Sequence, residues 1–219
     1  DEAIESIYRY DENRLVGGVP ASGWSNYYNP GNLLVPAAGY AVNLGPDTGP
    51  LTVDITGEVT NGDITVPVFN NDQPYTVGFN LVGNPYPSPV DWDMIDALNT
   101  NIDNAVYYFS NSDIDQYGGA YVTYINGVSS DGMATNIIPS MQGFFIHVTD
   151  GVFPVEGSLV MNNSVRVNNL DHPFIKSAEA DQTKLLRLSA SFSTSPETPD
   201  YTVVYFDEQA TPEFDGQFD

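Results

Sequence analysis

Two Asn-Gly pairs constrain the fold of this chain more than any other feature of its sequence. Asn61-Gly62 lies in the segment EVTNGDITVPV, and Asn126-Gly127 lies in AYVTYINGVSS. Both residues of such a pair accept the positive φ angles of a two-residue hairpin turn, and the flanking segments alternate between apolar and polar residues. The sequence therefore predicts an antiparallel β-hairpin at each pair.

The rest of the chain offers further strand candidates of the same kind. It contains 14 Tyr, 11 Phe, 19 Gly and 16 Pro, arranged as short aromatic and β-branched segments between turn residues. The segments that best fit strands are 39–43, 51–55, 77–82, 105–109, 143–148 and 164–167. Many short strands separated by turns predict an all-β fold, and in particular a β-sandwich.

The segment GNPYPSPVDWD interrupts this strand pattern. Its prolines at 85, 87 and 89 lack the N–H donors that a sheet needs, so they end the preceding strand. Residues before a proline are pushed towards extended geometry, which prevents a helix from starting early. We therefore interpret the segment as a structural corner rather than a working site.

One short helix is predicted directly after this corner, near residues 89–98. Ser88 suits the N-cap, and the proline after it suits the first helical position. Val90, Met94 and Leu98 would then share one face of the helix.

The chain divides by texture into a module, a linker and a tail. Residues 1–170 form the β-sandwich module. Within it VPAAGYAVNL resembles IPSMQGFFIHV, which suggests two related lobes at about 24–78 and 79–168. Residues 171–184 are polar and patternless and are interpreted as a linker.

The tail, residues 185–219, contains two further strand candidates. LLRLSASF and YTVVYF each fit a strand, and the intervening STSPETPD fits a loop. Since two strands make no stable domain, they either pack on the module or begin a second β domain. The chain opens on Asp1 rather than Met, so we expect it to be a piece of a longer protein.

Composition excludes several partners. Six Lys plus Arg stand against 29 Asp plus Glu, which gives a net charge of -23. Such an acidic protein repels nucleic acids and anionic lipid surfaces. No apolar run approaches the roughly 18 residues of a membrane-spanning helix, so no membrane insertion is expected. The absence of cysteine excludes disulfides and thiolate metal sites.

Catalytic signatures are weak, and we expect no enzymatic activity. His147 and His172 lie in no recognisable motif, and we interpret His147 as an ordinary sheet residue on the face opposite Phe145. Asp91 and Asp93 could act as paired carboxylates of a glycosidase. They are better explained as acids that stabilise the first turn of a helix.

Calcium is the one cofactor that the sequence suggests. In NSDIDQYGG, Asp113 and Asp115 stand at alternate positions before two glycines. Carboxylates are ligands that Ca²⁺ prefers, although the complete EF-hand pattern is missing. The alternative is an ordinary polar turn.

Clustered aromatic residues suggest a carbohydrate platform. Trp24, Tyr27 and Tyr28 lie in GWSNYYNP, and Tyr108 lies in AVYYFS. Consecutive aromatics on a strand point to opposite faces, so one of each pair is expected in the core while the other could bind a sugar.

Several of these segments together resemble a known module. FNLVGNPYPSPVDWD is followed in order by NIDNAVYYF, YVTYINGV, IPSMQGFFIHV and NSVRV. This succession, over roughly residues 24–167, resembles a β-rich module in the C-terminal regions of large secreted and surface proteins of the Bacteroidota. That module often precedes a sorting domain read by the type IX secretion system. The resemblance implies an extracellular or cell-surface location, and it carries over no catalytic residue.

The sequence thus predicts a non-catalytic extracellular module that serves as a structural spacer or adhesion domain. Its expected partners are other domains of the same polypeptide and an extracellular glycan or surface protein. A carbohydrate-binding module of a secreted polysaccharide-degrading enzyme is the main alternative. A glycosidase that uses Asp91 and Asp93 is the third.

Overall fold

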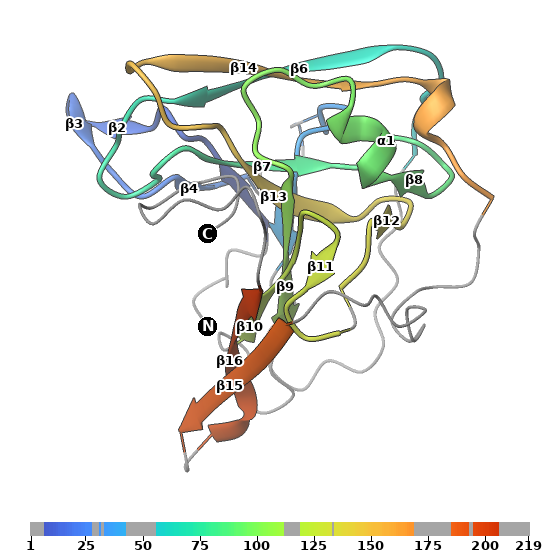
Figure 1. The fold of residues 1–219 in the computed structure, drawn as a ribbon. Coiled ribbons are helices and arrows are strands. Elements are labelled where there is room, and N and C mark those ends of the chain that lie inside the picture. The colour runs from blue at the N-terminus through green and yellow to red at the C-terminus, as the bar shows by residue number, and fades with distance from the viewer. Residues whose placement is uncertain are drawn as a thin grey trace, which may run out of the picture.

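A computed structural model shows an all-β fold of antiparallel sheets (Figure 1). It describes residues 7–27, 31, 33–42, 56–111, 119–132, 134–168, 185–192 and 195–205. Within these ranges the helical elements are one short α-helix and one 3-10 turn. The architecture confirms the predicted sandwich-like class, with one short helix inside residues 89–98.

A five-stranded sheet in the order β11-β10-β9-β13-β7 forms the centre of the fold. Its strands are β7 (Phe79–Gly83), β9 (Ala105–Asn111), β10 (Gly119–Ile125), β11 (Val128–Ser129) and β13 (Gly143–His147).

Smaller sheets surround this central sheet. The three-stranded one, β4-β1-β5, consists of β1 (Ile7–Tyr10), β4 (Trp24–Asn26) and β5 (Tyr40–Val42). The four pairs are β2 (Leu15–Val16) with β3 (Val19–Pro20), β6 (Ile64–Asn70) with β14 (Val155–Met161), β8 (Val90–Asp91) with β12 (Ile137–Ile138), and β15 (Leu185–Phe192) with β16 (Ser195–Tyr205).

The hydrophobic core lies between one face of the central sheet and the β6–β14 ribbon. In Figure 1 this ribbon runs across the top of the molecule, beside α1 (Trp92–Asp96). Core residues come from the sheet, the ribbon and the helix, and include Val82, Val106, Phe144, Ile146, Val68, Leu159, Met161, Trp92 and Ile95. Burial of these large side chains supplies the main driving force for the sandwich.

The two Asn-Gly pairs have different outcomes. Asn126 and Gly127 take φ angles of 48° and 85° and connect β10 to β11, with Ile125 opposite Val128, so that predicted hairpin is confirmed. No hairpin forms at Asn61-Gly62 within the described residues, because 56–60 is not a strand and β6 pairs along its whole length with β14. Residues 51–55 lie outside the described ranges.

The helix begins later than predicted. Asp91, not Ser88, is the N-cap, and its side chain accepts a hydrogen bond from the backbone N–H of Asp93. The start is delayed because β8 occupies the preceding two residues in its pairing with β12. The buried face belongs to Trp92 and Ile95, whereas Met94 and Leu98 are exposed, so the predicted face was wrong as well.

Most other predicted strands are present with small changes of boundary. The segments 39–43, 77–82, 105–109 and 143–148 overlap β5, β7, β9 and β13. The strand predicted at 164–167 was wrong, since η1 (Asn163–Val165) occupies its first half and Arg166 forms only an isolated bridge with Val90. The predicted loop at 193–200 was also wrong in part, because β16 starts at Ser195.

The proline corner is built around Asn84, whose side chain is 3% exposed. Its amide nitrogen lies within hydrogen-bonding distance of the carbonyls of Ser88, Ile138 and Pro139, and its oxygen accepts from the backbone N–H of Tyr86. The Tyr86 ring is fully buried, and its hydroxyl donates to the carbonyl of Gly62 at 2.7 Å. The corner therefore joins three loops inside the core. Within the described chain, the peptide bond between Phe153 and Pro154 is cis.

The two similar sequence segments form the same turn on opposite edges of β7. The N–H of Ala38 donates to the carbonyl of Val35, and the N–H of Gln142 donates to the carbonyl of Pro139. The third residue of each turn, Ala37 or Met141, has a positive φ of 63° or 66°. The division into two lobes and the domain boundaries stay predictions. β16 contacts β10, so the described hairpin of the tail touches the module.

Candidate functional site

The face of the central sheet that points away from the core is aromatic. Side chains alternate along a strand, so Phe144 and Ile146 enter the core and Phe145 lies on the opposite side. Register then places Tyr107 on β9 directly opposite Phe145. Tyr121 on β10 continues this face, with its ring centroid 5.9 Å from that of Phe145.

The sheet β4-β1-β5 adds two more rings to this face. Tyr10 on β1 pairs with Trp24 on β4. Their ring centroids lie 5.0 and 5.9 Å from that of Phe145. Gly23 allows the Tyr10 ring to lie close to the backbone, because a Cβ atom at residue 23 would lie 2.6 Å from that ring.

These rings surround an open cavity of about 360 Å³. Apart from Ser22 and Gly23, the described residues that line it are all aromatic: Tyr10, Trp24, Tyr75, Phe79, Tyr107, Tyr121 and Phe145. Phe145 is only 8% exposed and forms the floor, while Tyr75 and Tyr121 are 66% and 47% exposed at the mouth. The volume lies at the lower end of the range for small-ligand sites, which are concave and mostly apolar.

Three tyrosines of the cavity, Tyr10, Tyr107 and Tyr121, have raised pKa values and stay neutral at physiological pH. Burial, with the nearby Glu12 carboxylate, raises the pKa of Tyr10 to about 12. Burial, with the charge of Asp103, raises the pKa of Tyr107 to about 12. Burial also raises the pKa of Tyr121. The cavity therefore presents aromatic faces and phenol hydroxyls.

A buried carboxylate supports the wall behind Tyr10. Glu12 is 3% exposed, and its oxygens accept hydrogen bonds from the backbone N–H and the side-chain amide of Asn71, at 3.1 and 2.8 Å. Thr76 donates its hydroxyl to the backbone carbonyl of Glu12 at 3.1 Å. These bonds tie the turn after β1 to the loop that carries Tyr75.

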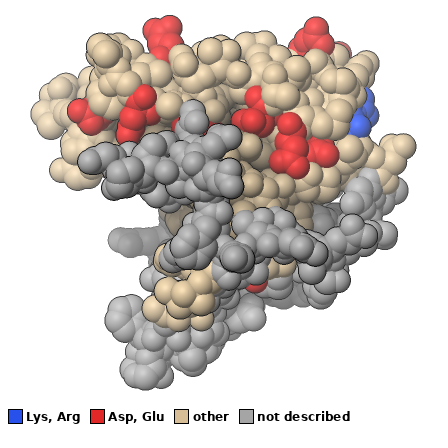
Figure 2. All heavy atoms as spheres, in the orientation of Figure 1, with Lys and Arg blue, Asp and Glu red and all other residues tan. Residues whose placement is uncertain are grey.

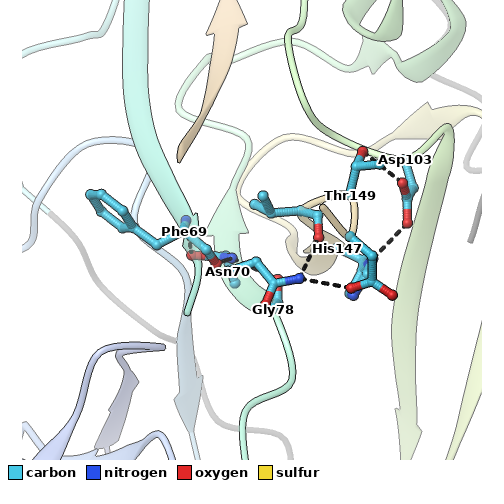
Figure 3. Close-up of polar contacts among 9 residues, drawn as sticks. Phe69, Asn70, Gly78, Asp103, His147 and Thr149 are labelled. Carbon is cyan, nitrogen blue, oxygen red and sulfur yellow. Dashed lines mark hydrogen bonds and ion pairs between the residues drawn. The ribbon is translucent and has the colours of Figure 1, made fainter. Parts of the chain in front are cut away.

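His147 and Asp103 form a second polar network beside the aromatic face (Figure 3). Nδ1 of His147 lies 2.5 Å from Oδ2 of Asp103, and the hydroxyl of Thr149 donates to the other carboxylate oxygen at 2.8 Å. Burial lowers the pKa of His147, but the hydrogen bond and charge of Asp103, aided by Asp150, outweigh burial and raise it overall.

The position predicted for His147 was wrong. His147 and Phe145 lie two residues apart on β13 and share a face, as residues two apart on a strand do. The imidazole packs on Phe79, with ring centroids 5.0 Å apart. It contacts a wall of the cavity from outside and is not among the residues that line it.

Asp91 and Asp93 lie at the start of α1, which packs on the core side of the sheet. The side-chain amide of Asn136 donates to both carboxylates, at 2.8 and 3.0 Å, and the Tyr124 hydroxyl donates to Asp93 at 3.2 Å. Burial and then the charge of Asp91 raise the pKa of Asp93. The pair caps the helix and fixes neighbouring side chains.

The other residues predicted to bind ligands are separated. Trp24 lines the cavity. Tyr27 donates its hydroxyl to the carbonyl of Leu33 and packs on Tyr40 instead. Tyr108 lies on the core side, where its hydroxyl donates to the carbonyl of Thr135 and burial raises its pKa. Tyr28, Asp113 and Asp115 lie outside the described residues.

Sequence reasoning missed most of the cavity. Among its aromatic residues, Trp24 was predicted to bind a ligand, and Tyr107 belongs to the AVYYFS cluster from which Tyr108 was selected instead. Tyr107, Phe145 and Tyr121 carry a local signal, since each alternates with core residues on its strand. Within the described ranges, no group of three or more His, Cys, Asp or Glu could hold a metal ion, and no helix is long and apolar enough to span a membrane.

Comparison with known families gives one result. The sequence profile of the family described as "Domain of unknown function (DUF8693)" matches the chain over residues 1–219. No curated protein and no solved structure matches it.

Proposed function

The chain belongs to the DUF8693 family, and we propose that it is a non-catalytic module of an extracellular or cell-surface protein. In this proposal it serves as an adhesion domain that binds an external partner through the aromatic cavity. The remainder of its surface makes it a spacer between neighbouring domains of the same polypeptide.

The observation that carries the proposal is the set of aromatic residues that face the cavity. Its floor and most of its walls come from paired strands, which hold Phe145, Tyr107 and Tyr121 in fixed positions. Aromatic side chains offer a large contact area at low cost in conformational entropy, and they dominate the energetics of interfaces. Rigid elements also position a binding site more accurately than loops do.

The charged groups that could perform chemistry are engaged elsewhere. Asp103 is occupied by His147 and Thr149, and Asp91 and Asp93 are joined through Asn136. Neither group lines the cavity. This separation of the polar networks from the cavity favours binding over catalysis.

Two further features support an extracellular, modular role. The resemblance to surface modules of the Bacteroidota extends over most of the described core, including the corner at Asn84. The net charge of -23 suits a protein that remains soluble and does not associate with anionic surfaces.

The proposal is tested by adhesion and by location. The purified chain is coated on beads, and its binding to candidate surfaces is measured for wild type, Trp24→Ala and Tyr121→Ala. Both variants should lose most of the binding, whereas the control Tyr27→Ala should retain it, because Tyr27 packs on Tyr40 outside the cavity. Equal adhesion by all four proteins would remove the cavity from the proposal.

Location is measured separately. An antibody against the chain should label intact cells of the organism that produces it. Labelling only after the cells are broken open would refute the extracellular role.

Carbohydrate binding is the second candidate function. Its support is Trp24, which was predicted as part of a sugar platform and which lines the cavity. A glycan array with the same variants tests it: a glycan retained by wild type and Tyr27→Ala, but lost by Trp24→Ala, would establish this alternative.

A further inference from the structure

We propose that the aromatic cavity binds an organic cation whose charge is carried by a methylated ammonium group. The inference rests on the proposed function, because it names the ligand class of the same cavity. It is argued from the arrangement of the rings, the polarity of the lining and the charges behind the walls.

The rings stand perpendicular to one another. Tyr10, Trp24 and Phe145 meet pairwise at interplanar angles of 78°, 88° and 82°. A sugar ring stacks on a flat aromatic platform, which such rings do not form. Edge-to-face packing fixes these rings at different orientations around one cavity, and the negative π face of an aromatic ring attracts an alkylated ammonium ion within roughly 6 Å of its centroid.

The lining also lacks the groups that recognise sugars. Its polar groups are the Ser22 hydroxyl, the tyrosine hydroxyls and the indole N–H of Trp24, and no carboxylate, carboxamide or guanidinium occurs among the described residues that line it. Sugar hydroxyls left without hydrogen bonds in such a site would lose their contacts with water uncompensated. A methylated ammonium group has no such requirement, since its methyl groups present an apolar surface.

The charges near the cavity then favour a cationic ligand over a neutral apolar one. The Glu12 carboxylate is buried behind Tyr10 and is held by the neutral donors of Asn71 and Thr76. The ion pair of the described chain is His147 with Asp103, so Glu12 has no cationic partner there. A buried charge without a counterion is costly, and a cation in the adjacent cavity would reduce that cost.

Among the described residues, Arg14 is a basic group that lies close to the cavity. A guanidinium nitrogen of Arg14 donates to the backbone carbonyl of Ser22 at 2.8 Å. The positive charge of Arg14 opposes the entry of a cation. The negative charge of Glu12 nearby and the net charge of -23 on the whole chain act in the other direction. On the face shown in Figure 2, acidic side chains are distributed over the described residues, and basic side chains are visible at one edge. The long-range field therefore favours the approach of cations.

A pair of matched ligands tests the inference. Choline carries a trimethylammonium group, and 3,3-dimethylbutan-1-ol has the same shape with a neutral carbon in place of the nitrogen. Binding of each to the full chain is followed by NMR titration. We expect choline to bind at least about 5-fold more tightly than the neutral isostere, the ratio given by roughly 1 kcal/mol of cation–π attraction.

Variants locate the binding. Tyr121→Ala, whose side chain is largely exposed, should weaken choline binding about 5- to 30-fold without loss of folding. Tyr27→Ala is the matched control and should leave binding unchanged. Arg14→Gln should strengthen choline binding, because it removes the opposing charge, and should leave binding of the neutral isostere unchanged.

A second arm distinguishes the source of the cation. Choline is compared with the amide of N-acetyl-trimethyllysine, which presents the same group on an amino-acid side chain. Tighter binding of the lysine derivative would assign the site to a methylated protein segment, and tighter binding of choline to a small molecule or headgroup.

The outcomes separate this inference from the proposed function. Equal binding of choline and its neutral isostere, or no binding of either, would overturn the cation inference even if adhesion still depends on Trp24. Choline binding that requires Tyr121 would sustain the inference even if adhesion proved independent of the cavity, in which case the adhesion role would fall alone.

Discussion

Replacement of Asn84 by alanine should strongly destabilise the proline corner. The side chain has two N–H groups, so two of the three carbonyls within its reach receive a full hydrogen bond at one time. Its oxygen adds a third bond from the N–H of Tyr86. Asn84→Ala removes all of these bonds and leaves buried polar groups without partners.

The magnitude follows from the hydrogen bonds that are lost. Three bonds at about 1 kcal/mol each predict a loss of roughly 3 kcal/mol in the free energy of unfolding. For a chain of this size, that corresponds to a decrease in Tm of roughly 6–12 °C.

Urea unfolding followed by tryptophan fluorescence measures this loss, because Trp92 is fully buried and reports on the core. The midpoint should fall while the slope of the transition stays unchanged, since the surface exposed on unfolding is the same. Asn162→Ala is the matched control: its side chain caps a single 3-10 turn at the surface, so the loss should be at most about 1 kcal/mol. Equal losses for the two variants would refute the role assigned to Asn84.

Three further predictions concern other parts of the fold. The pKa of His147 is raised in the folded chain, so its contribution to stability is complete below about pH 6.5 and is lost as the pH rises through the higher folded pKa. The Tm of wild type, measured across this pH range, should therefore fall relative to the Tm of His147→Gln. Parallel Tm curves for the two proteins would contradict the assignment. Gly39→Ala would place a Cβ atom 2.5 Å from Leu81 Cγ and should cost about 1–3 kcal/mol in chemical denaturation, whereas Gly57→Ala, which meets open space, should change stability by less than about 0.5 kcal/mol. Gly127 has a φ of 85°, so Gly127→Ala should cost about 1–2 kcal/mol in the same assay, and an unchanged midpoint would contradict the turn geometry.

Local signals in the sequence were sufficient for several elements. The Asn126-Gly127 hairpin needs only its two turn residues and the strands beside them, and it was predicted correctly. The end of β7 at Gly83 follows from the prolines after it, which have no N–H to donate. The short helix was also predicted, although its start was not, because the pairing of β8 with β12 involves residues far away in the chain.

Long-range pairing decided what local signals could not. The sequence around Asn61-Gly62 is compatible with a local hairpin, but β6 pairs with β14 and buries its apolar side chains in the common core. In the same way, the neighbouring aromatics Tyr107 and Tyr108 are equivalent in sequence. The pairing of β9 with β13 places Tyr107 opposite Phe145 and leaves Tyr108 in the core.

The candidate site was the least predictable feature, because its residues come from two sheets that are distant in sequence and contact each other only in the folded chain. Tyr10 and Trp24 reach the cavity only because β4-β1-β5 lies over the aromatic face of the central sheet. No spacing in the sequence indicates that contact. Of the aromatic residues named as candidates, Trp24 lines the cavity, whereas Tyr27 and Tyr108 pack on other groups.

The two buried polar networks, around Glu12 and around His147 and Asp103, both support walls of the aromatic cavity. The Glu12 bonds fix the loop that carries Tyr75, and the His147–Asp103 pair supports Phe79 from behind. Each network is costly to bury and lies directly behind a different wall of the same cavity. Hydrogen-bonded supports of fixed geometry, rather than aliphatic packing alone, therefore position the rings that line the cavity.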